Sequence, residues 1–275
     1  MHGTSYARNI DAKALSKASV RRFRIFGILL ALVCGHAGAA ANAGPETPPT
    51  GAFTVTYTTA ELLGDDAARV EPVIPQDEPI TWEIYVPPGY RQEAPAGLFV
   101  YVSPMPSGKL PGKWRRVMDE RNLIWIGANR SGNRVVVGRR MLFAVLAILV
   151  AEQGYAVDTR RFYVSGFSGG GKVASRLATA HAQIFTGGFF IGGVEVWQDE
   201  QPDDIETMRS NRYVFLCGSN DQALRSCRQA SRAYNAAGVE ATELMIIRGM
   251  GHDTPDTSDF EKAIIFLDSS GDGTD

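Results

Sequence analysis

The stretch "FYVSGFSGGGKVAS", residues 162–175, places one serine among glycines between two apolar segments. Residues 161–165 have the composition of a short buried strand, and residues 171–182 form an amphipathic helical pattern. Ser168 therefore falls on the turn between strand and helix, where Gly166-Phe167-Ser168-Gly169-Gly170 fits G-x-S-x-G. Larger side chains beside Ser168 would collide with the strand and the helix. The free N–H groups at the start of the helix favour a developing negative charge, so the pattern predicts a nucleophilic serine.

Two other interpretations of this segment are a plain glycine-rich turn and a phosphate-binding loop. The phosphate-binding pattern G-x-x-x-x-G-K-[ST] is absent, because Lys172 is followed by Val173. The dinucleotide pattern G-x-G-x-x-G does not fit either. The strand before Ser168 and the helix after it favour the nucleophile.

A serine hydroxyl needs an adjacent base, and the sequence contains only four histidines. His2 and His36 lie near the N-terminus, in a segment that we expect to be removed. His181 lies in the helix that starts beside Ser168, about 20 Å along its axis, which is too far for a hydrogen bond. His252, in the loop "RGMGHDTPD" after a strand, is the predicted base.

The third member of a triad is a carboxylate that orients the histidine. Asp221, in "VFLCGSNDQA", directly follows a strand and is the best candidate, with an N-cap for the next helix as its alternative role. The order Ser168, Asp221, His252 is that of the G-x-S-x-G hydrolases. The other carboxylates considered lie after an earlier strand or beside the histidine: Glu195, Asp199, Asp203, Asp204 and Asp253.

Strands and helices alternate along the rest of the chain, which predicts a mostly parallel central sheet with helices on both faces. The expected strands are 53–59, 80–86, 97–102, 123–128, 161–165, one within 185–196, 212–217 and 242–247. The expected helices are 113–121, 139–153, 171–182, 222–237 and 257–267. About 20 residues separate the strand near Gly192 from the next one, which leaves room for only a minimal lid. We expect one catalytic domain over residues 44–275.

The N-terminal segment has the layout of a secretory signal peptide. Arg21, Arg22 and Arg24 precede the apolar run 25–34, and Ala41-Asn42-Ala43 is a small-x-small cleavage site. A membrane anchor is the alternative, but the run is about half of the roughly 20 residues that a spanning helix needs. We expect residues 1–43 to be cleaved near Ala43, giving a secreted or periplasmic protein without a stable membrane anchor.

The net charge excludes one class of partner. Without residues 1–43 the chain carries 22 basic and 29 acidic residues, a net charge of −7, with no run of basic residues, so nucleic acid is not expected as a partner.

Cys217 and Cys227 are then the only cysteines, and in an exported protein an even count suggests a disulfide. Two buried free thiols are the alternative. A metal site is not expected, because no second cysteine pair or histidine cluster accompanies them.

With these motifs the chain resembles the α/β-hydrolase superfamily, and more narrowly secreted esterases related to poly(3-hydroxybutyrate) depolymerases and feruloyl or acetylxylan esterases. The resemblance covers the chain from about Ile80 to the C-terminus. It rests on "WEIYVPPGY" (82–90), "DTRRFYVSGFSGGGKVASRLA" (158–178), "FLCGSNDQ" (215–222) and "GMGHDTPD" (249–256). It implies a serine hydrolase with the triad above that cleaves small-molecule or polymeric esters and needs no cofactor.

The chain departs from the family at the second oxyanion donor. Many members carry His-Gly after the third core strand, where this sequence reads Val102-Ser103-Pro104-Met105. Pro104 has no N–H, so Gly169 and Met105 are the expected backbone donors, with the Ser103 side chain as a substitute. Phe167, Trp114 and Trp197 lie near the loops expected to rim the cleft and are candidates to contact an apolar acyl group or aromatic ring, with ordinary packing as the alternative for each.

Carboxylic ester hydrolysis through an acyl-enzyme is the predicted activity. Two alternatives remain open on the sequence alone. One is a peptidase or amidase with the same triad, and the other is a catalytically inactive binding protein on the same scaffold.

Overall fold

The computed structural model describes residues 48–197 and 200–269. The expected signal peptide, residues 1–43, lies outside the described residues, and its cleavage stays a prediction. Within the described ranges, no helix is both long and apolar enough to cross a membrane.

One eight-stranded sheet forms the centre of the domain, with strand order β1-β2-β4-β3-β5-β6-β7-β8. β2 pairs antiparallel with both β1 and β4, whereas the pairs β4–β3, β3–β5, β5–β6, β6–β7 and β7–β8 are all parallel. The bounds are β1 Gly51–Tyr57, β2 Ile80–Val86, β3 Ala96–Val102, β4 Leu123–Ala128, β5 Val157–Phe167, β6 Gly187–Ile191, β7 Arg212–Gly218 and β8 Thr242–Ile247. The carboxyl ends of the parallel strands therefore meet at one edge.

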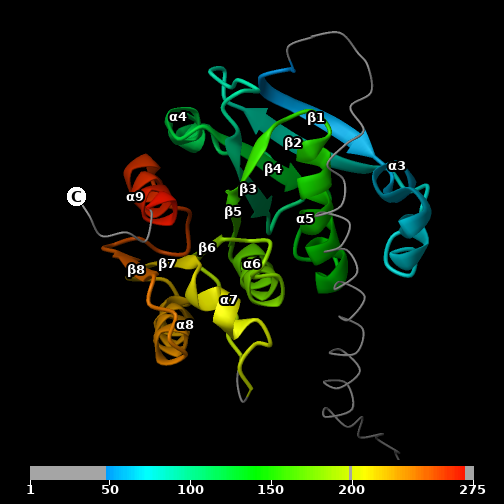
Figure 1. Ribbon diagram of the computed structural model, residues 1–275. Coiled ribbons are helices and arrows are strands. Elements are labelled where there is room, and N and C mark those ends of the chain that lie inside the picture. The colour runs from blue at the N-terminus through cyan, green and yellow to red at the C-terminus, as the bar shows by residue number, and fades with distance from the viewer. Residues whose placement is uncertain (1–47, 198–199, 270–275) are drawn as a thin grey trace, which may run out of the picture. The chain divides into compact units, whose positions relative to one another are not determined.

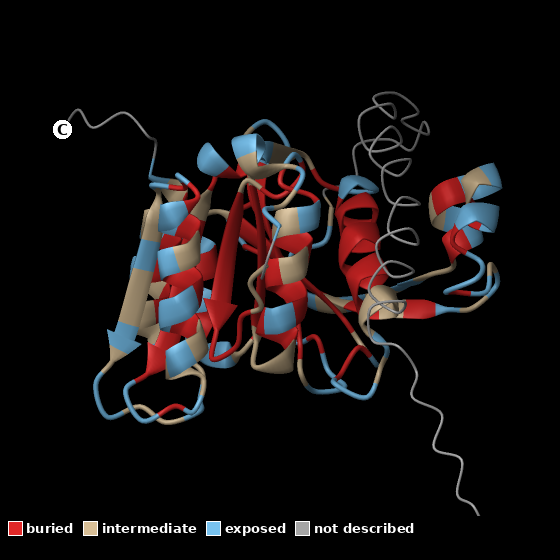
Figure 2. Cartoon of the chain, turned by 90° about the horizontal axis from the view of Figure 1, so that it is seen from below, coloured by how far each residue is buried: buried red, intermediate tan, exposed pale blue. Residues whose placement is uncertain are grey.

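Helices cover both faces of this sheet, as the alternating pattern predicts (Figure 1). α4 and α9 lie together on one face, while α5, α6 and α8 pack on the other. Figure 2 shows buried strands in the middle of the sheet and exposed residues on the outer sides of the helices. The helices are α3 Thr59–Leu63, η1 Gly64–Arg69, η2 Gly112–Trp114, α4 Arg115–Glu120, α5 Val137–Glu152, α6 Gly169–Ala180, α7 Ile205–Arg209, α8 Leu224–Ala236 and α9 Thr257–Asp268.

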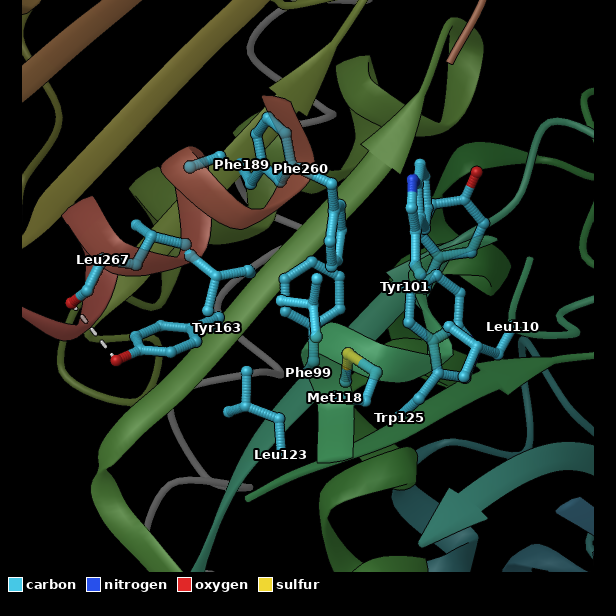
Figure 3. Packing of buried hydrophobic residues seen from close by; sticks show 14 of the residues in the cluster. Phe99, Tyr101, Leu110, Met118, Leu123, Trp125, Tyr163, Phe189, Phe260 and Leu267 are labelled. Carbon is cyan, nitrogen blue, oxygen red and sulfur yellow. Dashed lines mark hydrogen bonds between the residues drawn. The ribbon is translucent and has the colours of Figure 1, made fainter. Parts of the chain in front are cut away.

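Aromatic side chains fill the space between the sheet and α9 (Figure 3). Phe99 of β3 stacks on Trp125 of β4 and meets the edge of Phe260 in α9. Trp114 belongs to this cluster and is fully buried, with its ring centroid 4.3 Å from that of Phe260. The expectation that Trp114 rims the substrate cleft is therefore wrong: the large apolar ring is held in the core.

Trp114 nevertheless has a link to the loop that carries His252. Its indole N–H donates a hydrogen bond of 3.1 Å to the carbonyl oxygen of Pro255. The neighbouring Lys113 donates to the carbonyl oxygen of Thr254 at 3.1 Å. The segment just after His252 is thus fastened to the aromatic cluster, which fixes the course of the histidine loop.

Candidate active site

Ser168 lies on a strained turn between β5 and α6, at φ 54° and ψ −120°. A positive φ is uncommon for a residue with a side chain and here aims the hydroxyl above the sheet edge. The positions around Ser168 require glycine because a side chain there would collide with neighbouring backbone. A Cβ on Gly170 would lie 1.8 Å from the Val102 carbonyl oxygen, and one on Gly166 would lie 2.4 Å from the carbonyl carbon of Gly170.

The structure brings the three predicted triad residues together, although they lie far apart in the sequence. His252 Nε2 lies 2.9 Å from Ser168 Oγ. On the other side of the ring, His252 Nδ1 lies 2.9 Å from Asp221 Oδ1 and 3.1 Å from Oδ2. The carboxylate side chain is completely buried, whereas the imidazole is one-third exposed. This arrangement suits an imidazole that accepts a proton from Ser168 while a buried carboxylate stabilises its charged form.

A hydrogen bond between the loops after β7 and β8 helps to hold Asp221 beside His252. The N–H of Asn220 donates to the carbonyl oxygen of Met250 at 3.0 Å. Asp221 Oδ1 also accepts the N–H of Ala223 at 2.8 Å, and Ala223 rather than Asp221 is the N-cap residue of α8. The expected disulfide between Cys217 and Cys227 is present and closes the loop that contains Asp221.

Two of the five alternative carboxylates have other partners in the structure. Glu195 forms an ion pair with Arg176, and Asp253 accepts the N–H of the adjacent Thr254. Asp199 lies outside the described residues, and the pKa of Asp204 is raised by burial and by the charge of Asp203. Asp221 is the carboxylate that contacts the imidazole.

The two remaining aromatic candidates occupy different environments. The ring of Phe167, which is half-buried, lies 4.8 Å from the His252 ring and packs beside it. Trp197 instead packs with its centroid 4.8 Å from that of Tyr234 in α8, and Tyr234 contacts Tyr213 near the start of β7. Trp197 is half-buried and packs on α8, and its place at the rim of the cleft stays a prediction.

The backbone donors expected for an oxyanion differ in their availability. Gly169 is the first residue of α6, and the first N–H groups of a helix have no acceptor within it. The N–H of Met105, by contrast, donates to Ser103 Oγ at 3.1 Å. Met105 can serve as the second donor only when this local bond is exchanged for one to substrate. Its side chain is 64% exposed, so the chain around it borders solvent.

Asn133, which the sequence analysis did not single out, lies against Gly169. A Cβ built on Gly169 would be 2.3 Å from Asn133 Oδ1 and 3.0 Å from Nδ2. The backbone N–H of Asn133 donates to the Pro104 carbonyl oxygen at 2.9 Å. The loop after β4 thus carries a side-chain amide to the place where the α6 N-terminus opens. No motif in the sequence marks this residue.

Arg140 is a second residue that the sequence analysis missed, and it lies buried beneath the same loops. Its Nε donates to Ser131 O at 2.8 Å, its Nη2 to Ser103 O at 2.9 Å and its Nη1 to Gly169 O at 3.3 Å. Burial lowers the pKa of Arg140, and it makes no ion pair with a carboxylate in residues 48–197 or 200–269. One guanidinium therefore joins the segments after β3, β4 and β5.

His181 lies at the other end of α6, as its position in the sequence predicts. It is the C-cap residue of α6 and only 4% exposed. Burial lowers the pKa of His181 to about 4, so its ring is neutral near pH 7. Its environment is that of a packing histidine.

This burial predicts a pH-dependent stability. Because the folded-state pKa lies below the ordinary value of 6.5, the unfolded chain binds more protons between pH 6.5 and 4. We expect His181 to reduce the free energy of unfolding by about 3 kcal/mol as the pH falls through this window. Urea denaturation of the wild type and His181→Gln at pH 7 and pH 4.5 measures the contribution. If the free energies of unfolding of the wild type and His181→Gln differ by the same amount at both pH values, the prediction is wrong.

Comparisons with known proteins identify the fold. The sequence matches no protein-family model and no curated protein. A ferulic acid esterase structure aligns at TM-score 0.54 and 16% identity over 79% of this chain and 96% of its own. The Staphylococcus aureus fluorophosphonate-binding serine hydrolase F aligns at TM-score 0.58 and 11% identity, over 81% and 100% of the two chains. LpqC, a poly(3-hydroxybutyrate) depolymerase from Bordetella parapertussis, aligns at TM-score 0.52 and 14% identity, over 78% and 94%. The chain has the α/β-hydrolase fold, which confirms the predicted fold class.

Proposed function

We propose that the protein is an exported serine hydrolase that cleaves carboxylic esters through an acyl-enzyme. The observation that carries the proposal is the continuous chain of contacts from the buried Asp221 carboxylate through His252 to Ser168 Oγ. The disulfide supports export, because such bonds persist in oxidising compartments. The similarity in fold to esterase structures adds to this support.

The reaction follows from the positions of these groups. Ser168 Oγ attacks the ester carbonyl carbon while His252 Nε2 takes the hydroxyl proton, and Asp221 holds the Nδ1–H. The tetrahedral intermediate collapses, its bond to the alcohol oxygen breaks, and His252 returns the proton to the leaving alcohol. Water then attacks the acyl-enzyme with His252 again as the base, which releases the acid and restores Ser168. These steps require no metal or organic cofactor.

The oxyanion is stabilised at the N-terminus of α6 in this proposal. The N–H of Gly169 is the first donor, and the N–H of Met105 becomes the second when it leaves Ser103 Oγ. Each such donor contributes about 3 kcal/mol to transition-state stabilisation. The polar side chain of Asn133 is a further candidate, since it lies against Gly169.

Labelling by a fluorophosphonate tests the proposed function directly. We expect covalent modification that peptide mapping assigns to Ser168, together with hydrolysis of p-nitrophenyl acetate and butyrate. The same acyl groups presented as p-nitroanilides measure amide cleavage. Faster turnover of the anilides would indicate an amidase, and an unlabelled, inactive protein would indicate a binding protein.

Asn133→Ala is expected to lower kcat for p-nitrophenyl acetate at least tenfold with little change in KM. The reason is that a donor to the oxyanion acts in the transition state more than in the ground state. Arg134→Ala, at the next exposed position, is the matched control and is expected to retain activity. Steady-state kinetics on both variants, with thermal melting to check folding, measures the effect. Equal kcat values for Asn133→Ala and Arg134→Ala would remove Asn133 from the proposed site.

A further inference from the structure

Three arginines form a row on the outer side of α8. Arg225, Arg228 and Arg232 are all exposed, and their spacing of three and four residues places them on one side of the helix. The helix sequence, LRSCRQASRAYNA, contains no acidic residue and no lysine. We call these three residues the arginine face.

The arginine face forms no ion pair in the part of the chain that the structure describes. None of its three guanidinium groups forms an ion pair there, although arginines 69, 116, 139, 160, 161, 176 and 209 all do. Like charges three and four residues apart destabilise a helix. Arg225 also lies in the first turn, where the helix dipole disfavours a cation. An external anion would offset both effects.

The arginine face borders a surface hollow that begins beside the triad. The hollow has a volume of about 620 Å³, and besides the arginines it is lined by Asp221, Gln222, Leu224 and Gln229. Asp221 precedes α8 at the carboxyl edge of the sheet, where Ser168 also lies. α8 runs away from that edge alongside β7 and β8 (Figure 1). The row of arginines spans about 10 Å of helix from there.

We propose that the arginine face binds an anionic polysaccharide, and that the ester cleaved at Ser168 is carried by the same polymer. The proposal rests on the proposed esterase function and assigns it a substrate class. Guanidinium groups pair with carboxylates in a bidentate manner, so a chain of acidic sugars offers matching partners. The amides of Gln222 and Gln229 can donate to and accept from sugar hydroxyls.

A linear polymer fits this surface better than a membrane or a nucleic acid. The hollow is concave and its rim is mostly polar, whereas a bilayer surface is broad and would also meet the acidic remainder of the protein. The chain has 30 acidic against 28 basic residues, so a flat anionic surface is repelled outside the arginine face. The one aromatic residue of α8, Tyr234, is fully buried and cannot stack on a base.

Two acetylated polymers of equal acetyl content test the proposal. O-acetylated polygalacturonate is anionic, and O-acetylated dextran is neutral. We expect the wild type to show at least tenfold higher kcat/KM on the anionic polymer at low ionic strength, and this preference to weaken as salt screens the charges. In Arg225→Gln/Arg228→Gln/Arg232→Gln, kcat/KM on the anionic polymer relative to p-nitrophenyl acetate should fall at least tenfold.

A matched variant separates position from net charge. Arg69→Gln/Arg91→Gln/Arg160→Gln removes the same charge from exposed sites outside α8 and should keep the preference for the anionic polymer. Equal wild-type rates on both polymers, or equal losses in the two triple variants, would overturn the proposal.

Binding measurements distinguish this proposal from the esterase function on which it rests. Calorimetry with unesterified polygalacturonate should show binding by the wild type that the α8 triple variant loses. If that binding is present and no ester is hydrolysed, the binding site stands and the esterase function fails. If esters are hydrolysed without such binding, the substrate class is overturned. Binding to phosphatidylglycerol vesicles or single-stranded DNA instead, lost in the same variant, would also overturn it.

Discussion

Ser168→Ala is expected to lower kcat for p-nitrophenyl acetate by about 10⁴-fold or more, because it removes the only atom that attacks the ester in the proposed mechanism. Fluorophosphonate labelling should disappear with it. The serine hydroxyl contacts His252 at 2.9 Å and is not part of the core, so the fold should persist. The melting temperature is expected to change by only a few degrees.

Ser107→Ala is the matched control for this experiment. Ser107 is an exposed serine in the loop after β3, and its hydroxyl accepts the N–H of Lys109. This variant should retain near wild-type turnover. If Ser168→Ala keeps more than a tenth of the wild-type kcat while remaining folded, the acyl-enzyme mechanism at Ser168 is wrong.

Arg140→Met is expected to lower kcat by about 100-fold or more with a much smaller change in KM. The substitution keeps the apolar stem and removes the donors to the carbonyl groups of Ser131, Ser103 and Gly169. These carbonyls fix the segments that would hold the oxyanion donors, so their release should cost about as much as losing one donor. Arg140 is thus a positioning residue, since it acts through the backbone around Ser168.

Two further measurements separate positioning from a general loss of stability. Buried carbonyls without donors cost about 1–3 kcal/mol each, so Arg140→Met should also unfold at lower urea concentration. In Arg140→Ala, added guanidinium ion should restore part of kcat, whereas Arg140→Lys, which lacks the forked geometry, should recover little. Arg139→Met, next along α5 but ion-paired to Glu78 on the surface, is the control. A folded Arg140→Met with normal kcat would exclude the positioning role.

The sequence predicts the sheet and the proximity of Ser168, Asp221 and His252 well, because both depend on local signals at strand ends. β2, β4 and β8 have the bounds expected from alternating or continuous apolar runs. Ser168, Asp221 and His252 each follow a parallel strand, so the topology alone brings them to one edge. α3 and α7 are missed because helices of five residues are too short to show a period. Thr58 caps α3, which explains why β1 ends at Tyr57 and not at Thr59.

The parts that could not be predicted depend on contacts between segments far apart in the chain. Trp114 and Trp197 lie near the loops that the sequence places around the cleft, but the first is buried against α9 and the second packs on α8. Arg140 reads as one more charge at the start of an apolar helix. The arginine face escapes notice because no two of its residues are adjacent, so a scan for basic runs finds nothing until the helix places them side by side.

The hydrogen bond from Trp114 to Pro255 has a practical consequence for attempts to engineer the protein. It couples the loop that carries His252 to the packing beneath α4 and α9, on the side of the sheet away from α6. Substitutions that repack the side chains beneath α4 and α9 to raise the melting temperature should therefore change kcat as well. Substitutions along the β1 edge, which has no such connection to the histidine loop, should alter melting temperature alone.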